Sequence, residues 1–176
     1  MQDFTNETID LDKLPKYQEI VLTAPDQKYW KVIIINICIF LFIIGIGLGL
    51  FLWLNTYIKP YTYPIIGGFL VFGILLFLIH RASFKKRGYA LREKDIVYKS
   101  GIIAEKTSIV PLNRIQHVSL DEGVFSRMYG LATLEIHTAG GSAGHMHIAG
   151  IPVEKASVIK EALLKRIDLL ESLAAD

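Results

Sequence analysis

Two long apolar runs dominate the first half of the chain. Residues 32–54 form a run of 23 residues in which Asn36 is the only strongly polar side chain, and residues 63–79 form a second run of 17. At 1.5 Å per residue, a helix of the first length crosses a hydrocarbon core of about 30 Å. A short polar connector containing Pro60 joins the runs. The pattern therefore predicts a transmembrane hairpin of two helices within residues 30–80.

The first apolar run does not have the features of a cleaved signal peptide. It is preceded by 31 residues, six of them acidic, and no small-residue cleavage site follows it. A secretory signal has instead a basic start and a shorter apolar core. We expect residues 1–29, with three lysines against six acidic residues, to form an acidic segment outside the bilayer.

Basic residues near the ends of the runs predict the orientation of the hairpin. The connector has one, Lys59, whereas the N-terminal flank has Lys28 and Lys31. The exit of the second run has four: Arg81, Lys85, Lys86 and Arg87. Because basic residues favour the cytoplasmic side, both termini are expected there, in a bacterial inner membrane. The four also form a candidate cluster for anionic lipid head groups.

Small residues in the first run offer a packing surface. Gly45 and Gly49 are spaced so that another helix could approach closely, either within the hairpin or in an oligomer. Neither run contains Asp, Glu, Lys or Arg. Ion and substrate pathways usually need such groups, so a transporter is not indicated.

Short alternating segments replace the long apolar runs after residue 87. Six of them, separated by turn residues, are candidate strands: 88–93, 96–103, 107–112, 114–120, 131–138 and 145–150. Residues 124–130 predict one or two helical turns ended by Gly130 at positive φ. A final amphipathic helix after Pro152 is predicted by one apolar stripe: Ile159, Leu163, Ile167 and Leu170.

These elements predict a membrane-anchored α+β chain. Residues 81–176 are expected to form a cytoplasmic domain in which a bent antiparallel sheet or barrel is capped by the final helix. The domain has 14 Lys and Arg against 11 Asp and Glu over residues 80–176. A short link over residues 79–88 would keep it close to the bilayer.

Two stretches of the domain, PLNRIQHV and RMYGLATLEIHTAGG, resemble the bacterial pleckstrin-homology (PH) domain family of membrane proteins, of the YdbS-like type. The motif residues include Pro111, Arg114, Ile115, Gln116, Gly130, Leu131, Thr138 and Gly140. The resemblance implies a two-helix anchor followed by a PH-like domain. It also implies a larger membrane-protein partner that carries repeated domains of the same type. It implies no chemistry, because fold alone does not give function.

Histidines and a glutamate in the last two strands form a candidate metal site. If residues 138–144 close a symmetric hairpin, His137 faces His145, Glu135 faces His147, and all four share one sheet face. Three imidazoles and a carboxylate can bind zinc. Polar side chains on a solvated strand face, however, need no ligand, and both interpretations remain open.

Phosphate-binding features are missing where they would be expected. The first hairpin turn, residues 93–95, has a net charge of −1, whereas phosphate recognition needs converging basic donors. The loop 139–144, AGGSAG, lacks the Lys and the following helix of a phosphate loop. Arg114 is expected to pair with Asp121 or Glu122 and tie the loop after its strand into the fold.

No catalytic arrangement is recognisable in the chain, and Cys38 is its single cysteine. We predict no enzymatic activity, no cofactor and no nucleic-acid partner. The predicted function is that of an inner-membrane protein whose PH-like domain mediates assembly with a membrane-protein partner, or self-association. The alternatives are a module that binds anionic lipid and a metal-binding protein.

Overall fold

The computed structural model describes residues 20–102, 104–138 and 145–175. The sequence predictions for residues 1–19 and for the loop 139–144, which includes Gly140, lie outside the described residues. The side chain of Leu170, the last member of the predicted apolar stripe, also lies outside them.

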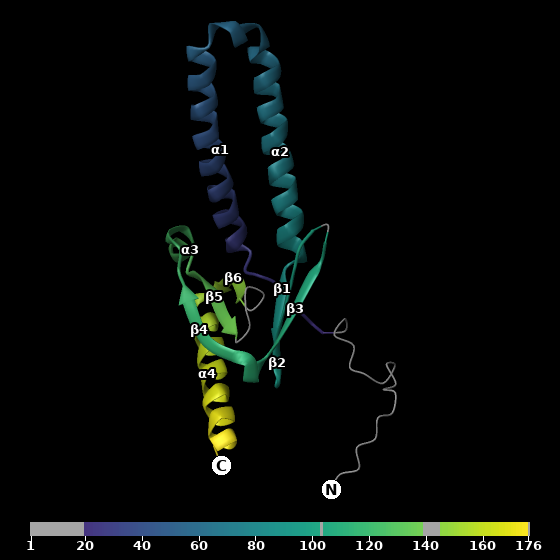
Figure 1. The fold of residues 1–176 in the computed structure, drawn as a ribbon, viewed down its shortest axis with the longest axis vertical. Helices are drawn as coiled ribbons and strands as arrows, with labels where there is room; N and C mark the ends of the chain where they lie inside the picture. Colours follow the sequence, from purple (N-terminus) through teal and green to yellow (C-terminus); the bar gives the residue numbers. More distant parts are fainter. Residues whose placement is uncertain (1–19, 103, 139–144, 176) are drawn as a thin grey trace, which may run out of the picture.

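Two long helices form the predicted hairpin. Helix α1 is Lys28–Leu54, the 3₁₀ turn η3 is Thr56–Tyr61, and α2 is Thr62–Lys86 (Figure 1). Both helices extend beyond the apolar runs. Arg87 alone separates α2 from the first strand, so the predicted link over residues 79–88 is wrong: most of it is helix. The sequence could not show this, because polar residues after an apolar run fit a helix as well as a link.

The surface of the hairpin is almost entirely apolar and uncovered. The most apolar windows of the two helices are 17% and 0% buried by the rest of the chain. At 1.5 Å per residue, α1 is about 40 Å long and exceeds a hydrocarbon core of about 30 Å. Trp53, Tyr57, Tyr61 and Tyr63 are all exposed around η3, where interfacial aromatic residues are expected. Lipid is the environment that such a hairpin requires.

Small residues bring the two helices together at two levels. A Cβ atom added to Gly45 would lie 3.6 Å from the ring of Phe69, and one on Gly73 would lie 3.3 Å from Leu41. Gly49 has open space around its Cα. One member of the predicted pair therefore packs within the hairpin, whereas the other faces the surroundings.

Six antiparallel strands, as predicted, make up the domain below the hairpin. They form two three-stranded sheets, β1-β2-β3 and β4-β5-β6, rather than one continuous sheet. Their bounds are β1 Gly88–Leu91, β2 Asp95–Ser100, β3 Lys106–Pro111, β4 Ile115–Asp121, β5 Leu131–Thr138 and β6 His145–Pro152. The 3₁₀ turn η4, Leu112–Arg114, separates the sheets at the break between β3 and β4.

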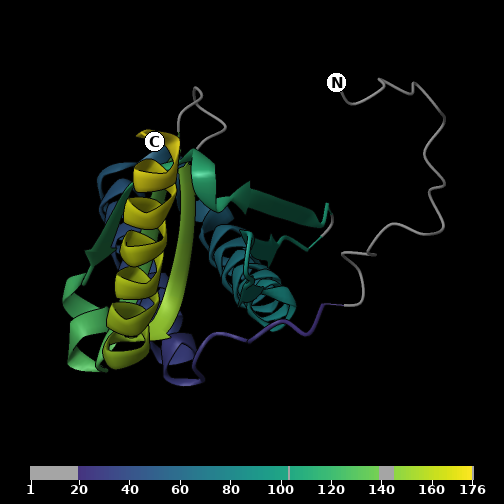
Figure 2. The same cartoon turned by 90° about the horizontal axis from the view of Figure 1, so that it is seen from below.

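Two helices complete the domain. The short α3, Val124–Met128, is followed by Gly130 at φ +66°, as the sequence predicts. The last helix, α4, is Val153–Ala175 and lies across the β4-β5-β6 sheet (Figure 2). Leu163 from its apolar stripe is 1% exposed, in the same core as Ile96 and Leu134 from the two sheets. The helix thus caps a core that both sheets share.

Residues 20–30 fasten this domain to the base of the hairpin. Thr23 and Tyr89 of β1 exchange two backbone hydrogen bonds, of 2.7 and 2.9 Å. The backbone N–H of Asp26 donates to the carbonyl of Gly150 in β6 at 2.8 Å. Trp30 then packs on the rings of Phe77 and Phe84 in α2. This anchoring segment, residues 20–30, therefore contacts β1, β6 and both helices.

Gly150 is needed where Tyr29 crosses β6. Its φ is +81°, and an added Cβ would lie 2.6 Å from Cγ of Tyr29. Gly130 has a similar φ of +66° but open space around it. The two glycines therefore share a backbone requirement, whereas only Gly150 has a steric one.

Gly150→Ala should therefore destabilise the protein more than Gly130→Ala. Each change costs about 1–2 kcal/mol for the left-handed backbone, and the clash with Tyr29 adds to this at Gly150 alone. Thermal unfolding in detergent measures both variants, with roughly 2–4 °C expected per kcal/mol. Equal losses of Tm would contradict the close contact between Tyr29 and β6.

Candidate functional site

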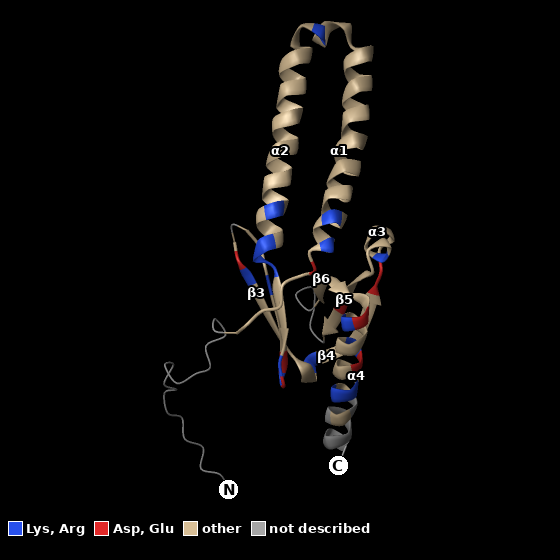
Figure 3. Ribbon diagram, turned by 180° about the vertical axis from the view of Figure 1, so that it is seen from behind, with Lys and Arg blue, Asp and Glu red and all other residues tan. Residues whose placement is uncertain are grey.

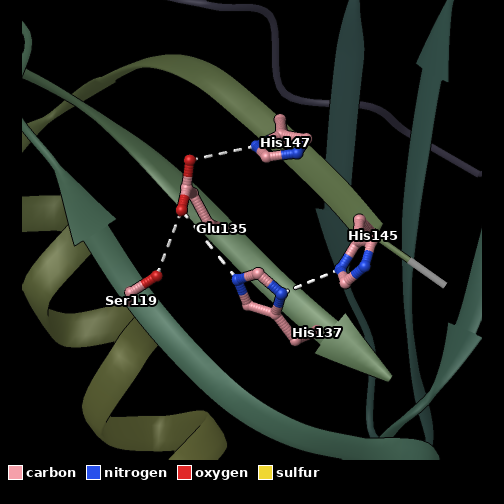
Figure 4. Close-up of polar contacts among 5 residues, drawn as sticks. All are labelled: Ser119, Glu135, His137, His145 and His147. Atoms are coloured by element: carbon pink, nitrogen blue, oxygen red, sulfur yellow. Dashed lines mark hydrogen bonds and ion pairs between the residues drawn. The ribbon is translucent and has the colours of Figure 1, made fainter. Parts of the chain in front are cut away.

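The register of β5 and β6 brings the predicted histidine face together. His137 is paired with His145, and Glu135 with His147 (Figure 4). The intervening apolar residues point into the core on the opposite face: Leu134, Ile136, Met146 and Ile148 are all buried. Both the register and the shared face that the sequence predicts are confirmed.

The polar side chains on this face form a chain of contacts. Glu135 contacts Nδ1 of His147 through Oε1 at 3.1 Å, and its Oε2 accepts a hydrogen bond from the Ser119 hydroxyl at 3.3 Å. Nε2 of His137 lies 3.9 Å from that Oε2. The Nδ1 atoms of His137 and His145 are 2.8 Å apart, so one must donate while the other accepts. Ser119, on the neighbouring strand, was not found by sequence reasoning.

This arrangement is a poor metal site. The nitrogen and oxygen atoms point toward one another along a line, rather than toward one shared point as tetrahedral zinc needs. Within the described part of the chain, no group of three or more His, Cys, Asp or Glu residues is placed to hold a metal ion. The geometry favours the interpretation of a hydrogen-bonded polar surface.

The four basic residues of the predicted lipid cluster lie near the base of α2 (Figure 3), but their environments differ. The Arg81 guanidinium lies 5.0 Å from the ring centroid of Trp30. Lys85 is exposed, and its side chain makes no hydrogen bond or ion pair with any described residue. Arg87 turns back along the helix and donates from Nη2 to the Ser83 hydroxyl at 3.4 Å. The cluster is therefore not one uniform basic patch.

Lys86 belongs to a small ion-pair network with the β2–β3 connection. Its Nζ lies 3.1 Å from Glu105, whose other oxygen lies 2.7 Å from Lys99. Hydrogen bonds from Lys99 and then from Lys86 lower the pKa of the Glu105 carboxyl. The carboxylate therefore stays charged at neutral pH and joins the end of α2 to the first sheet.

The family-motif residues mainly build the framework. Ile115 and Leu131 are buried in the core, and Pro111 leads into η4. Arg114 lies in η4, and the structure shows no ion pair between it and Asp121 or Glu122, so that predicted pairing is wrong. The fold turns at η4 without it, which the spacing of charges alone could not reveal.

The first hairpin turn is occupied by its own ion pair. Nε and Nη2 of Arg92 donate to the two carboxylate oxygens of Asp95, at 2.6 and 2.5 Å. The Asp95 hydrogen bond, followed by its negative charge, raises the pKa of Arg92. A basic residue at this turn is thus already neutralised, in agreement with the expectation that this turn does not bind phosphate.

A groove that the sequence did not predict lies between β1 and α4. Its volume is about 480 Å³. Leu91 and Val158 supply exposed apolar surface, and Val158 is 66% exposed. Thr23 from the anchoring segment lines the same groove, with Glu154 and Lys155 at the helix. This groove combines an apolar floor with an accessible strand edge.

Removing the central histidine of the polar chain tests the metal interpretation. His137→Ala should change the free energy of unfolding by less than about 0.5 kcal/mol, as for a surface position, and zinc should not raise the Tm of the unaltered protein. His117→Ala serves as control, since its ring lies beside that of His137, with centroids 5.9 Å apart, and outside the hydrogen-bonded chain. A zinc-dependent rise in Tm that only His137→Ala abolishes would restore the metal site.

Comparison with known proteins places this arrangement in a family. Residues 32–167 match the family described as Bacterial PH domain. The chain is 31% identical over 90 residues to the transmembrane protein YdbS of Bacillus subtilis, covering 51% of this chain and 55% of YdbS. It is 27% identical over 103 residues to the transmembrane protein YdbT of the same organism, covering 56% of this chain and 21% of YdbT. The chain thus spans about half of the first relative and a fifth of the second.

No solved structure matches the chain significantly. The family match extends over both helices of the hairpin, except the start of α1, and over the domain as far as the middle of α4. The hairpin, the two sheets and the capping helix thus form one family unit, and the chain is a membrane protein that belongs to the bacterial PH domain family.

Proposed function

We propose that this chain is a non-enzymatic assembly protein of a bacterial inner membrane. Both termini lie in the cytoplasm, and the PH-like domain binds a second membrane protein. The observation that carries the proposal is the open groove between β1 and α4, on a domain fastened to the membrane hairpin. A domain held in this way meets membrane-bound partners at a raised effective concentration.

The edge of β1 supports docking of an extended protein segment. Tyr89 directs both its N–H and its C=O to Thr23, away from β2. Because hydrogen-bonding direction alternates along a strand, Leu91 directs its backbone groups to the same outer edge. An added strand would use these groups, while Leu91 and Val158 would supply apolar contacts.

A membrane protein with the same type of domain is the partner that we favour. The chain resembles two transmembrane proteins of one bacterium, and its match covers only 21% of YdbT, which leaves most of that protein for other segments. Self-association through the same groove is the alternative. The family assignment supplies no catalytic residues, in keeping with a binding role.

Photo-crosslinking from α4 in native membranes tests the proposed groove. A photoreactive amino acid at Val158 should crosslink to one other membrane protein, identified by mass spectrometry. The same probe at Leu164 is the control, since this residue is also exposed on α4 but does not line the groove. Equal crosslinking from both positions would contradict the groove as the docking site, and adducts only with a second copy would establish self-association instead.

Labelling with a membrane-impermeant maleimide tests the proposed orientation. In a Cys38→Ser background, Lys59→Cys should be labelled in intact cells, because it lies in the connector at the far end of the hairpin. Lys85→Cys, at the base of α2, should react only after the membrane is opened. The reverse pattern would place the domain outside the cytoplasm.

A further inference from the structure

A second cavity lies between α1 and α2 at the base of the hairpin, with a volume of about 450 Å³. Its wall changes character along the helices. Ile37, Phe40 and Leu76 line the part farther from the domain, whereas Asn36, His80 and Arg87 supply polar groups. This order of apolar and polar groups is the one that an amphipathic lipid has across an interface.

Arg87 provides an unused hydrogen-bond donor at the polar end. Its Nε is shielded from solvent and has no hydrogen-bond partner among the described residues. Its Nη2 makes one long hydrogen bond, 3.4 Å, to Ser83, and no described carboxylate forms an ion pair with it. Shielded donors nearly always have a partner, and a guanidinium preferentially binds phosphate or carboxylate groups.

Two further polar groups of the cavity are also available. Nδ1 of His80 must donate to the carbonyl of Leu76, at 2.9 Å, because a carbonyl cannot donate, and this leaves Nε2 free of that bond. Asn36 is exposed on an otherwise apolar helix, and a polar amide in a bilayer requires a partner. No acidic residue lines the cavity in the described part of the chain.

The level of these groups matches the head-group layer of the bilayer. Hydrogen bonding to Ser83 holds the guanidinium of Arg87 near that residue, about 4.5 Å beyond His80 along the helix at 1.5 Å per residue. Arg81 and Trp30, both typical interfacial residues, stack beside it. Phe40 and Asn36 are exposed on the hairpin surface, so the cavity is open on a side that faces lipid.

We propose that this cavity binds the phosphate and glycerol region of one anionic phospholipid. Arg87 donates to the phosphate, and His80 and Asn36 bond the phosphate or the ester oxygens. The acyl chains leave past Phe40 and Leu76 into the bilayer. The absence of a carboxylate from the described lining leaves nothing to pair with the ammonium of a zwitterionic lipid, which accounts for the preference for a net negative head group.

Native mass spectrometry of the full-length protein in detergent tests this site. Titration with phosphatidylglycerol should give one bound lipid at concentrations where phosphatidylcholine gives none. Arg87→Gln should weaken phosphatidylglycerol binding about tenfold, the size expected when a charge-assisted hydrogen bond is lost. Lys85→Gln removes the same charge two residues away without a cavity contact, and it should bind as the unaltered protein does.

Two further arms keep the outcome decisive. Asn36→Leu, an apolar change on the lipid-facing surface, should also weaken binding, and it substitutes for Arg87→Gln if that variant does not fold. Inorganic phosphate should leave the Tm unchanged, whereas phosphatidylglycerol should raise it. Equal weakening by Lys85→Gln, no preference over phosphatidylcholine, or stabilisation by inorganic phosphate alone would each overturn the proposal. None of these outcomes depends on the groove between β1 and α4.

Discussion

The attachment of residues 20–30 to the domain is the constraint on which the arrangement of this protein depends. A two-helix hairpin and a PH-like domain joined only at Arg87 would have one covalent connection and considerable rotational freedom. The hydrogen bonds of Thr23 with Tyr89 and of Asp26 with Gly150 add a second connection from the opposite side of the domain. Because Gly150 lacks a side chain, Tyr29 can lie directly on β6. Two connections at separate strands define an orientation, which one connection cannot.

This attachment also explains why much of the family motif is structural. Gly130 permits the turn that leads into β5, and Ile115 and Leu131 enter the core that α4 caps. These positions determine how the two sheets meet, and hence where β1 and β6 present themselves to the anchoring segment. The polar chain around Glu135 lies on the other face of β5 and β6, where it does not affect this packing.

How far the sequence predicts each feature depends on the range of the interactions that produce it. Apolar runs and strand alternation are local, and they predicted the hairpin, the six strands and the shared face of His137 and His145. The division into two sheets, the extension of α2 through Lys86 and the bridge from Thr23 to Tyr89 depend on contacts between distant segments. Such contacts leave no periodic signal. Arg114 illustrates the converse error, because nearby opposite charges in the sequence did not become an ion pair in the fold.

The anchoring segment also connects the two candidate binding regions. Thr23 lines the groove between β1 and α4, and Tyr29, six residues later, lines the cavity between the transmembrane helices. Between them, Asp26 is hydrogen-bonded to Gly150, so the segment is held at its middle and contributes to a different site at each end. A ligand that binds one position of this segment better than another shifts the segment for both sites, and the coupling is reciprocal. Lipid occupancy of the hairpin and protein docking on the domain would then be linked through eleven residues of backbone, without any rearrangement of the core.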